Sequence, residues 1–411
     1  MTFMKYDFTS IIDRHGMDAA AIDEVGGWEI APTKPKDGYD FIPMWVADMN
    51  FPTAPSVTEA IIARSRHPLF GYYSPRKEYY DAIIGWQEKH NGMKDLKREY
   101  IGYENGVLGG VISAVRCYAE PGDSILVHSP TYIGFTGSLR GNGYHIVHSL
   151  LKQDKDGIYR MDYADMDTKI KKYHIKVAVF CSPHNPTGRV WKKEELEQAA
   201  SIFEENQVTV VSDEIWSDLL LHENKHIPFQ MVSPYARENT VALYAPSKTF
   251  NLAGLIGSYH IIYNKSMRER IRSHSERTHY NSMNVLSMHA LIGAYQDTGE
   301  EWLLELRKVL SRNVDYAVAY IRDHFEGVEV TKPEATYMLF LDAGEWCRNN
   351  HKKVEDLLHA GWDLGVGWQD GVAFGGPSHI RMNLALPFER VQEALKRLSQ
   401  HIFTGRIVRK I

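Results

Sequence analysis

A single lysine stands in a stretch that is suited to covalent chemistry. Lys248 lies between two hydroxyl residues, Ser247 and Thr249, and follows the β-branched and aromatic run 240–244. That run has the composition of a strand, so the lysine is placed just beyond a strand's end. Desolvation there would lower the pKa of the amine and make it a nucleophile that forms an imine with an aldehyde. Lysines near strand ends are common, so this interpretation depends on what else the chain supplies.

Three other chemically useful side chains follow predicted strands in the same way. Apolar and β-branched runs predict strands at 124–128, 176–181, 208–212 and 240–244. The side chains that come after these runs are, in order, Tyr132, Asn185, Asp213 and Lys248. Segments with helical spacing separate the strands, and this alternation predicts a mostly parallel sheet covered on both faces, an α/β fold. In such sheets ligands bind beyond the carboxyl ends of the strands, where these four residues are expected.

A turn that contains glycine precedes the apolar segment 111–118. The turn is Glu104-Asn-Gly-Val-Leu-Gly-Gly110, and glycines before a helix expose backbone N–H groups at the positive end of its dipole. This suits a phosphate, although the turn matches neither GxGxxG nor GxxxxGK[ST], which argues against dinucleotide and Walker-type sites. A reactive lysine, an acid, a flat ring and an anion cradle are the parts that a lysine-bound pyridoxal phosphate requires. Taken alone, the turn could also be a plain helix start.

The composition is that of an ordinary soluble globular protein. The chain has 411 residues, of which 44% are hydrophobic and 24% charged, and a formal net charge of -5. No basic block is present, so nucleic acid is not an expected partner. No apolar run approaches the ~20 residues of a membrane helix, and the first ten residues do not resemble a signal peptide. The cysteines Cys117, Cys181 and Cys347 lie far apart, which fits a reducing compartment and predicts a cytoplasmic location.

The length predicts two domains with additional segments at the ends. Residues 1–50 lack a sustained period, so we expect an N-terminal arm that joins the small domain. Residues 51–300 carry the alternating strands and helices of a large domain, and a capping box at Ser56-Val-Thr-Glu59 predicts a helix from Val57. Residues 301–403 predict a smaller α+β domain, and the basic segment 404–411 is expected to fray.

One motif suggests a different chemistry. His222-Glu-Asn-Lys-His226 matches HExxH, whose two histidines bind zinc only when they share one face of a helix. Asn224 and Pro228 favour a loop instead, and no third ligand is evident. We therefore expect two exposed histidines on a loop and no metal.

Four motifs, in this order, resemble the class I/II aminotransferase family of fold-type I pyridoxal phosphate enzymes. They are Ser182-Pro-His-Asn-Pro-Thr-Gly188, Asp213-Glu-Ile215, Ser247-Lys-Thr249 and His379-Ile-Arg-Met-Asn-Leu384. The resemblance runs over nearly the whole chain, and the combination is far more specific than any one motif. The segments most similar to the MalY/PatB subgroup, the cystathionine β-lyase or C–S lyase branch, are Trp45-Val-Ala-Asp-Met49, Phe70-Gly-Tyr72 and Ser247–Gly254. The resemblance implies a homodimer with active sites at the subunit interface.

The resemblance also implies a role for each matched residue. Lys248 would hold the cofactor and then move the proton at the substrate's Cα, and Asp213 would pair with the ring nitrogen. Arg381 would bind the substrate carboxylate as a bidentate fork, with a backbone group of Ala47 beside it. Asp213 could instead cap a helix, and Arg381 could be a surface arginine at a strand's end. The other implied contacts are Tyr132 on the ring face and near the substrate, Asn185 at the ring hydroxyl, Trp216 beside it, Val107, Leu108 and Ser247 at the phosphate, and Tyr72 from the neighbouring subunit.

Two positions depart from the family pattern. Many aminotransferases of this class carry an arginine against the phosphate at the position where this chain has Ile256. The tyrosine that commonly follows Asp-Glu-Ile is Trp216, whose indole has one N–H donor and no phenol. Both changes argue against a typical transaminase without proving a lyase.

The expected reaction is α,β-elimination from a sulfur amino acid. Loss of the Cα proton to Lys248 would expel a thiolate from Cβ of cystathionine or a related cysteine S-conjugate, and pyruvate and ammonia would follow by hydrolysis. An aminotransferase starts from the same carbanion, and a regulatory protein that retains the cofactor is a third hypothesis. No residue in the sequence decides between the two reactions, and no extra domain or tail gives strong support to the regulatory hypothesis.

Overall fold

The computed structural model describes residues 4–280 and 282–403, and the segment 404–411, expected to fray, lies outside them. Within the described residues the chain forms two compact units. The larger unit comprises Thr53–Asn185 and Arg189–Leu304. The smaller unit comprises the described parts of Met1–Pro52, Pro186–Gly188 and Glu305–Ile411. The long helix α12 (Asp297–His324) contributes residues to both units.

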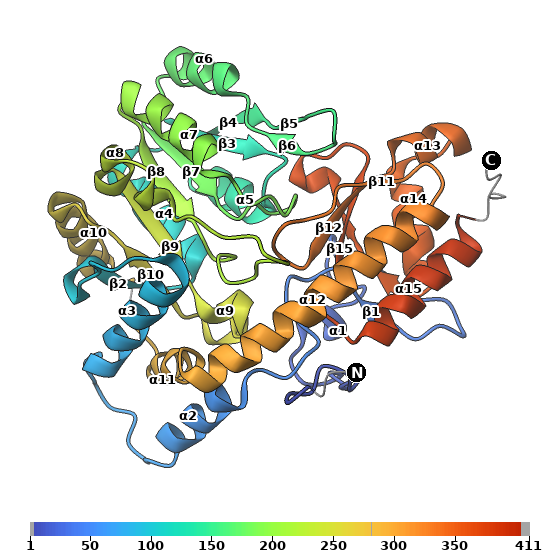
Figure 1. The fold of residues 1–411 in the computed structure, drawn as a ribbon, viewed down its shortest axis with the longest axis horizontal. Helices are drawn as coiled ribbons and strands as arrows, with labels where there is room; N and C mark the ends of the chain where they lie inside the picture. Colours follow the sequence, from blue (N-terminus) through green and yellow to red (C-terminus); the bar gives the residue numbers. More distant parts are fainter. Residues whose placement is uncertain (1–3, 281, 404–411) are drawn as a thin grey trace. The chain divides into compact units, whose positions relative to one another are not determined.

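A seven-stranded sheet forms the centre of the larger unit (Figure 1). Its strand order is β2-β10-β9-β8-β7-β3-β4. The pairs from β9 to β4 are all parallel, whereas β10 runs antiparallel to both β9 and β2. The mostly parallel sheet predicted from the sequence is therefore confirmed. The strands are β2 (Ile101–Glu104), β3 (Ser124–Ser129), β4 (His145–Leu150), β7 (Val177–Cys181), β8 (Thr209–Asp213), β9 (Thr240–Tyr244) and β10 (Ser258–Ile261).

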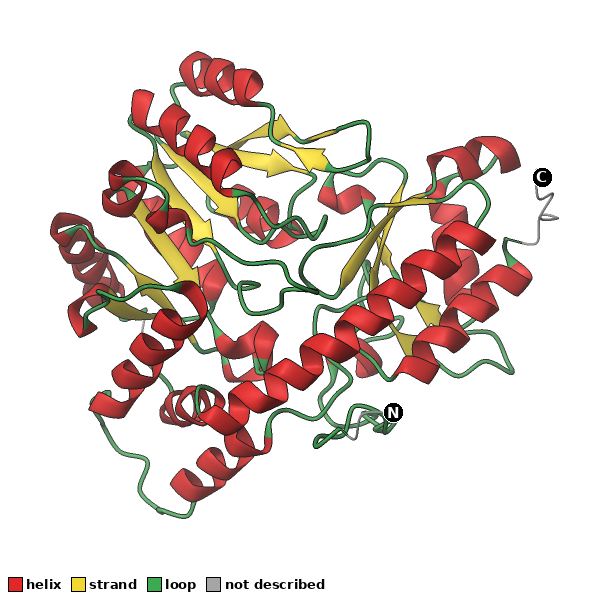
Figure 2. Ribbon diagram, in the orientation of Figure 1, coloured by secondary structure: helices red, strands yellow, loops and turns green. Residues whose placement is uncertain are grey.

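Helices cover both faces of this sheet (Figure 2) because its strands carry apolar side chains on both sides. In β3, Ile125 and Val127 belong to one core and Leu126 to the other, as the two-residue period of a strand requires. The helices of the first core are α4 (Val107–Tyr118), α5 (Ile133–Gly141) and α10 (Lys265–Thr278). Those of the second core are α6 (Tyr163–Tyr173), α7 (Lys193–Glu205) and α8 (Pro234–Glu238).

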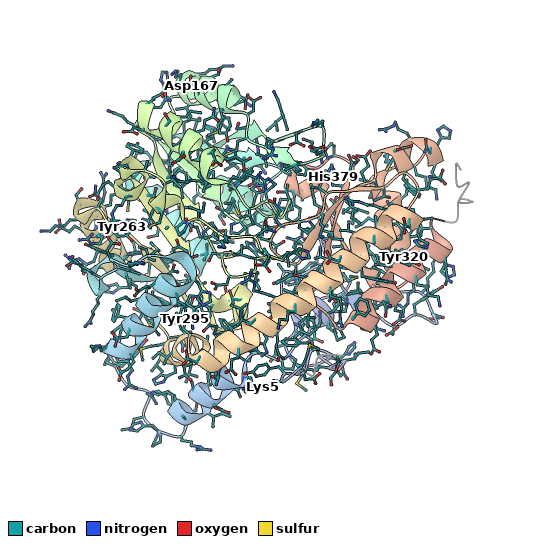
Figure 3. All side chains as sticks on the ribbon, viewed as in Figure 1. Lys5, Asp167, Tyr263, Tyr295, Tyr320 and His379 are labelled. Carbon is teal, nitrogen blue, oxygen red and sulfur yellow. The ribbon has the colours of Figure 1, made fainter. Side chains whose placement is uncertain are left out.

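A third core lies beside the antiparallel strands, under α3 (Lys77–Asn91) and α11 (Val285–Ala294). Trp86 stacks there on Tyr295, which is labelled in Figure 3, with ring centroids 4.4 Å apart. Trp86 Nε1 donates to buried Asp218 Oδ1 at 3.0 Å, and Asp218 Oδ2 accepts from the Thr249 hydroxyl at 2.9 Å. Since Thr249 ends the short helix α9 (Pro246–Thr249), this core braces the segment that carries Lys248.

The predicted start of the first helix in the larger unit is wrong. The capping box predicted Val57, but α2 (Pro55–Ser65) begins earlier and has Ala54 as its N-cap. Ser56 lies inside the first turn and is buried. Pro55 sets the start because a proline at the first helical position needs no partner for an N–H group. The other short elements of this unit are η1 (Arg98–Tyr100), β5 (Lys152–Gln153), β6 (Tyr159–Arg160), η2 (Phe229–Met231) and η3 (Ala253–Leu255).

The smaller unit contains a four-stranded antiparallel sheet of order β11-β12-β15-β14. Its central strands, β12 (Met338–Asp342) and β15 (His379–Asn383), place Phe340 opposite Arg381. The N-terminal segment adds a separate parallel pair between β1 (Ile42–Pro43) and β13 (Val366–Gly367). The remaining elements are α1 (Ala20–Asp23), β11 (Glu329–Val330), α13 (Gly344–Asn350), α14 (Val354–Asp363), β14 (Gln369–Asp370), η4 (Val372–Phe374) and α15 (Phe388–His401).

The NPTG part of the Ser182–Gly188 motif belongs in part to the smaller unit, and its glycine has a steric reason. Gly188 has φ of 69°, and a Cβ there would lie 2.3 Å from Pro333 Cβ and 2.9 Å from the Ala335 carbonyl oxygen. The Gly188 carbonyl accepts the N–H groups of Glu334 and Ala335 at 2.9 and 3.0 Å. Only a glycine permits this close approach of two backbone segments.

Residues 4–280 and 282–403 include no helix that combines the length and the apolar character needed to span a membrane. The same ranges contain no group of three or more His, Cys, Asp and Glu side chains placed to hold a metal ion.

Candidate active site

Four adjacent strands bring the predicted lysine, acid, amide and tyrosine to one edge of the sheet in the larger unit. β9, β8, β7 and β3 are neighbours and all parallel, so their carboxyl ends lie together. Asp213 is the last residue of β8 and is in register with Cys181 of β7 and Leu243 of β9. Tyr132 and Asn185 lie in the loops that follow β3 and β7, and Lys248 lies in α9, the short helix that follows β9.

Lys248 and Asp213 are close enough to interact electrostatically. Lys248 Nζ lies 5.8 Å from the centre of the buried Trp216 ring, and half-buried Ser247 precedes it in α9. The Asp213 carboxyl is buried, and its Oδ1 accepts the Ile215 N–H at 3.0 Å. Burial raises the pKa of Asp213 to about 7, against the opposing effects of that N–H and of the Lys248 charge. A cation beside this carboxyl would favour its ionised form, so Asp213 suits a positively charged ring nitrogen.

The N-terminus of α4 offers backbone donors for an anion. Its N-cap is Gly106, with φ of 79°, and no side chain caps this end of the helix in the described part of the chain. Val107 and Leu108 therefore begin the helix where its dipole is positive. A Cβ at Gly134 would lie 2.4 Å from the Tyr132 ring and 2.8 Å from the Leu108 side chain. The absence of a side chain at Gly134 leaves room for the Tyr132 ring and the Leu108 side chain beside it.

In the smaller unit, Arg381 lies at the centre of β15 and is only 3% exposed. The alternative of a surface arginine is therefore wrong. Arg381 Nη2 donates to the Trp45 carbonyl at 3.1 Å and to the side-chain oxygen of Gln369. The guanidinium carbon lies 4.5 Å from the centre of the Phe374 ring. Hydrogen bonds and an aromatic face thus define the plane of the guanidinium group.

The loop that contains Ala47 is attached to the same sheet through its carbonyl groups. Side chains of Arg381, Tyr337 and Asn383 donate to these groups over distances of 2.7 to 3.1 Å. The carbonyl groups that they bind are those of Trp45, Val46, Ala47 and Asp48. The loop is therefore fixed beside Arg381, and the contact of Ala47 with a carboxylate stays a prediction.

Comparison with known proteins agrees with this geometry. Residues 40–398 match the family described as aminotransferase class I and II. The chain belongs to this family. It is 35% identical to cystathionine β-lyase PatB of Bacillus subtilis over 87% of this chain and 92% of that protein. It is 30% identical to protein MalY of Escherichia coli over 95% of this chain and 97% of that protein. A pyridoxal phosphate-bound C–S lyase from Staphylococcus hominis superposes with a TM-score of 0.88, at 30% identity and over 97% and 98% of the two chains.

Two residues of this member of the aminotransferase class I and II family lie at the surface of the single chain. Tyr72 is fully exposed in the connection between α2 and α3. Ile256 is 53% exposed and has φ of 47°, an unusual backbone conformation for a β-branched side chain. Its Cγ2 would lie 3.7 Å from a Cβ at Gly106. An apolar residue therefore adjoins the anion cradle at the position where many family members have an arginine.

Sequence reasoning missed the buried carboxylate next to Asp213. Glu214 is fully buried, and it accepts the Tyr244 hydroxyl at 2.7 Å and the Phe229 N–H at 3.0 Å. His226 Nε2 lies 2.7 Å from Glu214 Oε2. The HExxH residues form a loop as expected, but the expectation of two exposed histidines is wrong because His226 is buried in this cluster. Its partner lies on another segment, so the motif alone gave no signal of the contact.

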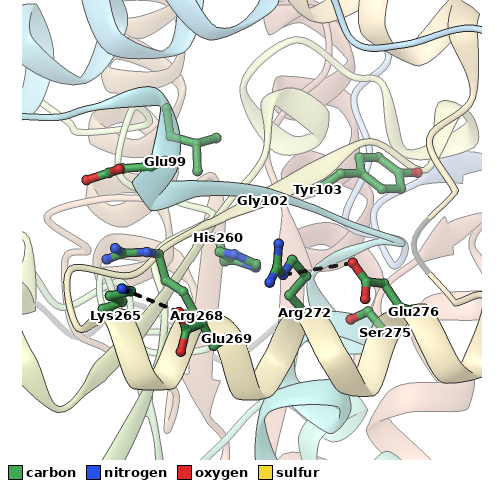
Figure 4. A pocket seen from close by; sticks show the side chains of 11 residues that line it. Glu99, Gly102, Tyr103, His260, Lys265, Arg268, Glu269, Arg272, Ser275 and Glu276 are labelled. Atoms are coloured by element: carbon green, nitrogen blue, oxygen red, sulfur yellow. Dashed lines mark ion pairs between the residues drawn. The ribbon is translucent and has the colours of Figure 1, made fainter.

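Figure 4 shows a different concave surface of the larger unit, a pocket of about 430 Å³ formed by β2, β10 and α10. Charges of both signs line it, with Lys265 and Arg272 each 3.8 Å from Glu269 and Glu276 respectively. The predicted site residues are not among its lining residues. Because its charges are balanced, this pocket does not favour a phosphate or a carboxylate.

Proposed function

We propose that this chain is a pyridoxal phosphate-dependent C–S β-lyase that acts on cystathionine or a related cysteine S-conjugate. Its similarity to PatB, named a cystathionine β-lyase, and to the Staphylococcus hominis C–S lyase supports this reaction over amino transfer. The observation that carries the proposal is the sheet edge where Lys248 and buried Asp213 lie together. Overall, one thioether and one water would become pyruvate, ammonia and a thiol.

The residues present fit pyridoxal phosphate. Asp213 is a buried carboxyl whose charge a protonated ring nitrogen would stabilise. The uncapped helix N-terminus at Val107 and Leu108, with the Ser247 hydroxyl, has the donor chemistry that a phosphate needs. Lys248 supplies the amine for the aldehyde. When bound, the cofactor supplies an electron-withdrawing ring that lets the substrate's Cα lose its proton.

Each residue then has a separate task in the elimination. Lys248 Nζ accepts the proton from Cα, and the electron pair left behind expels the thiolate from Cβ. Asp213 would keep the ring nitrogen protonated, and Arg381 would bind the substrate carboxylate and so orient the amino acid. The residues that would position the ring are Tyr132 on its face, Asn185 at its hydroxyl and Trp216 beside Lys248.

We further propose a homodimer in which Tyr72 of the partner subunit donates to the cofactor phosphate. The exposure of a large apolar and aromatic group supports this proposal, because such surface is normally covered. Leu69 is 69% exposed and Phe70 is 55% exposed, next to fully exposed Tyr72. Sedimentation analysis of the purified protein tests the assembly, and Tyr72→Phe should weaken cofactor binding while the dimer persists.

One assay tests the reaction. The purified protein, loaded with pyridoxal phosphate, is given cystathionine without any 2-oxo acid. We expect pyruvate and free thiol in equal amounts, and no product from Lys248→Ala. If pyruvate is absent but amino transfer starts when a 2-oxo acid is added, the protein is an aminotransferase and the lyase proposal is wrong.

A further inference from the structure

Gln369 is a buried side chain whose placement is explained by Arg381. Gln369 begins β14, is 6% exposed and is in register with Arg381 of the neighbouring strand β15. Its side-chain oxygen accepts from Arg381 Nη2, which also donates to the Trp45 carbonyl at 3.1 Å. Two acceptors on one nitrogen leave the guanidinium group little freedom to rotate.

An aromatic wall completes this arrangement. Phe374 lies against the guanidinium carbon at 4.5 Å and is buried. The segment that carries Phe374 is closely packed, because a Cβ at Gly376 would lie 2.6 Å from the Phe340 ring and 2.7 Å from His379. His379, labelled in Figure 3, stacks on Phe340 with ring centroids 4.4 Å apart. The Phe340 ring in turn lies 6.4 Å from the Phe374 ring, centroid to centroid, so protein side chains alone pack against Phe374 on this side.

The charge of the acceptor matters as much as its position. A glutamate has nearly the same shape as a glutamine and would form a stronger bond to an arginine. It would also place an anion against Nη2 and repel a carboxylate that approaches the same group. The carbonyl of Trp45, the amide of Gln369 and the ring of Phe374 are all neutral, so they orient the guanidinium group without cancelling its charge.

We propose that Gln369 is a positioning residue that orients Arg381 for the α-carboxylate of an amino acid and, being neutral, preserves the affinity for that carboxylate. The proposal rests on the proposed function only in taking Arg381 as the carboxylate receptor. It does not depend on whether the bound amino acid then undergoes elimination or amino transfer.

The test compares two variants, Gln369→Glu and Gln369→Leu, in the cofactor-loaded protein. The probes are L-alanine, which has an α-carboxylate but no leaving group, and ethylamine, which has no carboxylate. Dissociation constants are measured from the change in cofactor absorbance. Gln369→Glu should weaken L-alanine binding roughly 10- to 100-fold and Gln369→Leu by about 10-fold, while ethylamine binding stays within about 2-fold.

A matched control is Gln87→Leu, since Gln87 is also buried and donates to Tyr259 at 2.8 Å in the larger unit. It should lower the melting temperature without changing the ratio of the two dissociation constants. Equal weakening of both probes in the Gln369 variants, or unchanged L-alanine binding, would overturn the proposal. Normal L-alanine binding by Arg381→Gln would remove Arg381 as receptor, and with it the role of Gln369. Absence of pyruvate from the wild-type protein would refute only the lyase reaction.

Discussion

Asp213 and Arg381 are both buried and ionisable, yet the two units hold them in opposite ways. In the larger unit, Asp213 accepts the Ile215 N–H, and burial raises the pKa of its carboxyl to about 7. In the smaller unit, Arg381 donates to Trp45 and Gln369 and lies against an aromatic ring. Burial has the largest effect on the pKa of the Asp213 carboxyl. Neutral hydrogen-bond acceptors, in contrast, set the orientation of the Arg381 guanidinium group.

This difference indicates two kinds of preparation for a ligand. Burial makes the negative charge of Asp213 unfavourable despite the nearby Lys248, so a further cation bound beside this carboxyl would favour its ionised form. The guanidinium group of Arg381 is charged at all relevant pH values and is oriented before a ligand arrives. Changes at the first group should therefore alter the chemical step, and changes at the second should alter substrate affinity.

Replacement of Lys248 should have the largest effect on the larger unit's site. Lys248→Ala removes the amine that would both hold the cofactor and move the Cα proton, so we expect pyruvate formation to fall by ~10⁴-fold or more. Lys265→Ala on α10 is a matched control, because Lys265 lines the charge-balanced pocket and should leave the rate unchanged. A variant of Lys248 with more than a tenth of the wild-type kcat would contradict the assignment of the larger unit's site.

The raised pKa of Asp213 predicts a pH-dependent stability of the cofactor-free protein. Between pH 4 and pH 7 the folded chain retains a proton on Asp213 that the unfolded chain releases, so the unfolding free energy falls as pH rises through this window. The shift from 3.8 to about 7 corresponds to at most about 4 kcal/mol, at ~1.4 kcal/mol per pKa unit. Urea unfolding at several pH values should show this slope in the wild type and a smaller one in Asp213→Asn. Equal slopes in the wild type and in Asp213→Asn would show that burial of Asp213 does not cause this pH dependence.

Asp213→Asn should also separate the chemical step from substrate affinity. An amide does not carry the negative charge that keeps the ring nitrogen protonated, so we expect kcat to fall by roughly 10²- to 10³-fold, with KM changed less than about 3-fold. Steady-state kinetics with cystathionine measures both constants. Asp167→Asn, on the surface helix α6, should change neither. A rise of KM without a loss of kcat would mean that Asp213 contributes to substrate affinity, which is the role expected of Arg381.

The two regions were not equally accessible to sequence reasoning. The shared location of Tyr132, Asn185, Asp213 and Lys248 could be predicted because parallel strands end at one edge of a sheet, while their roles stay predictions. Arg381 lies within an antiparallel strand, where no such rule applies, and its expected role came from a family resemblance. Its contact with Gln369 depends on the register of β14 against β15, which only the folded chain defines.

The same limit explains the errors in the larger unit. The cluster at Glu214 joins His226 and Phe229 of one segment to Tyr244 of β9, so HExxH could not indicate that His226 is buried. The start of α2 was misplaced because Ser56 fits a capping box, yet Pro55 is the residue at the first helical position. Local sequence patterns were enough to predict the order of the helices and strands. Which side chains are buried, and which groups they bind, depends on contacts between segments that are distant in the sequence.

Arg381→Lys should have the smallest effect of these changes, and it tests the role of the guanidinium group directly. A lysine keeps the charge but cannot hold Trp45 and Gln369 with one planar group and also bind a carboxylate as a fork. We expect KM to rise by roughly 10- to 30-fold, with kcat within about 3-fold of the wild type. Arg268→Lys is the control, because Arg268 lies on α10 of the larger unit, donates to the Ile262 carbonyl at 3.1 Å and should leave KM unchanged. A loss confined to kcat would mean that Arg381 acts on the chemical step, and the contrast between the two buried charges would no longer hold.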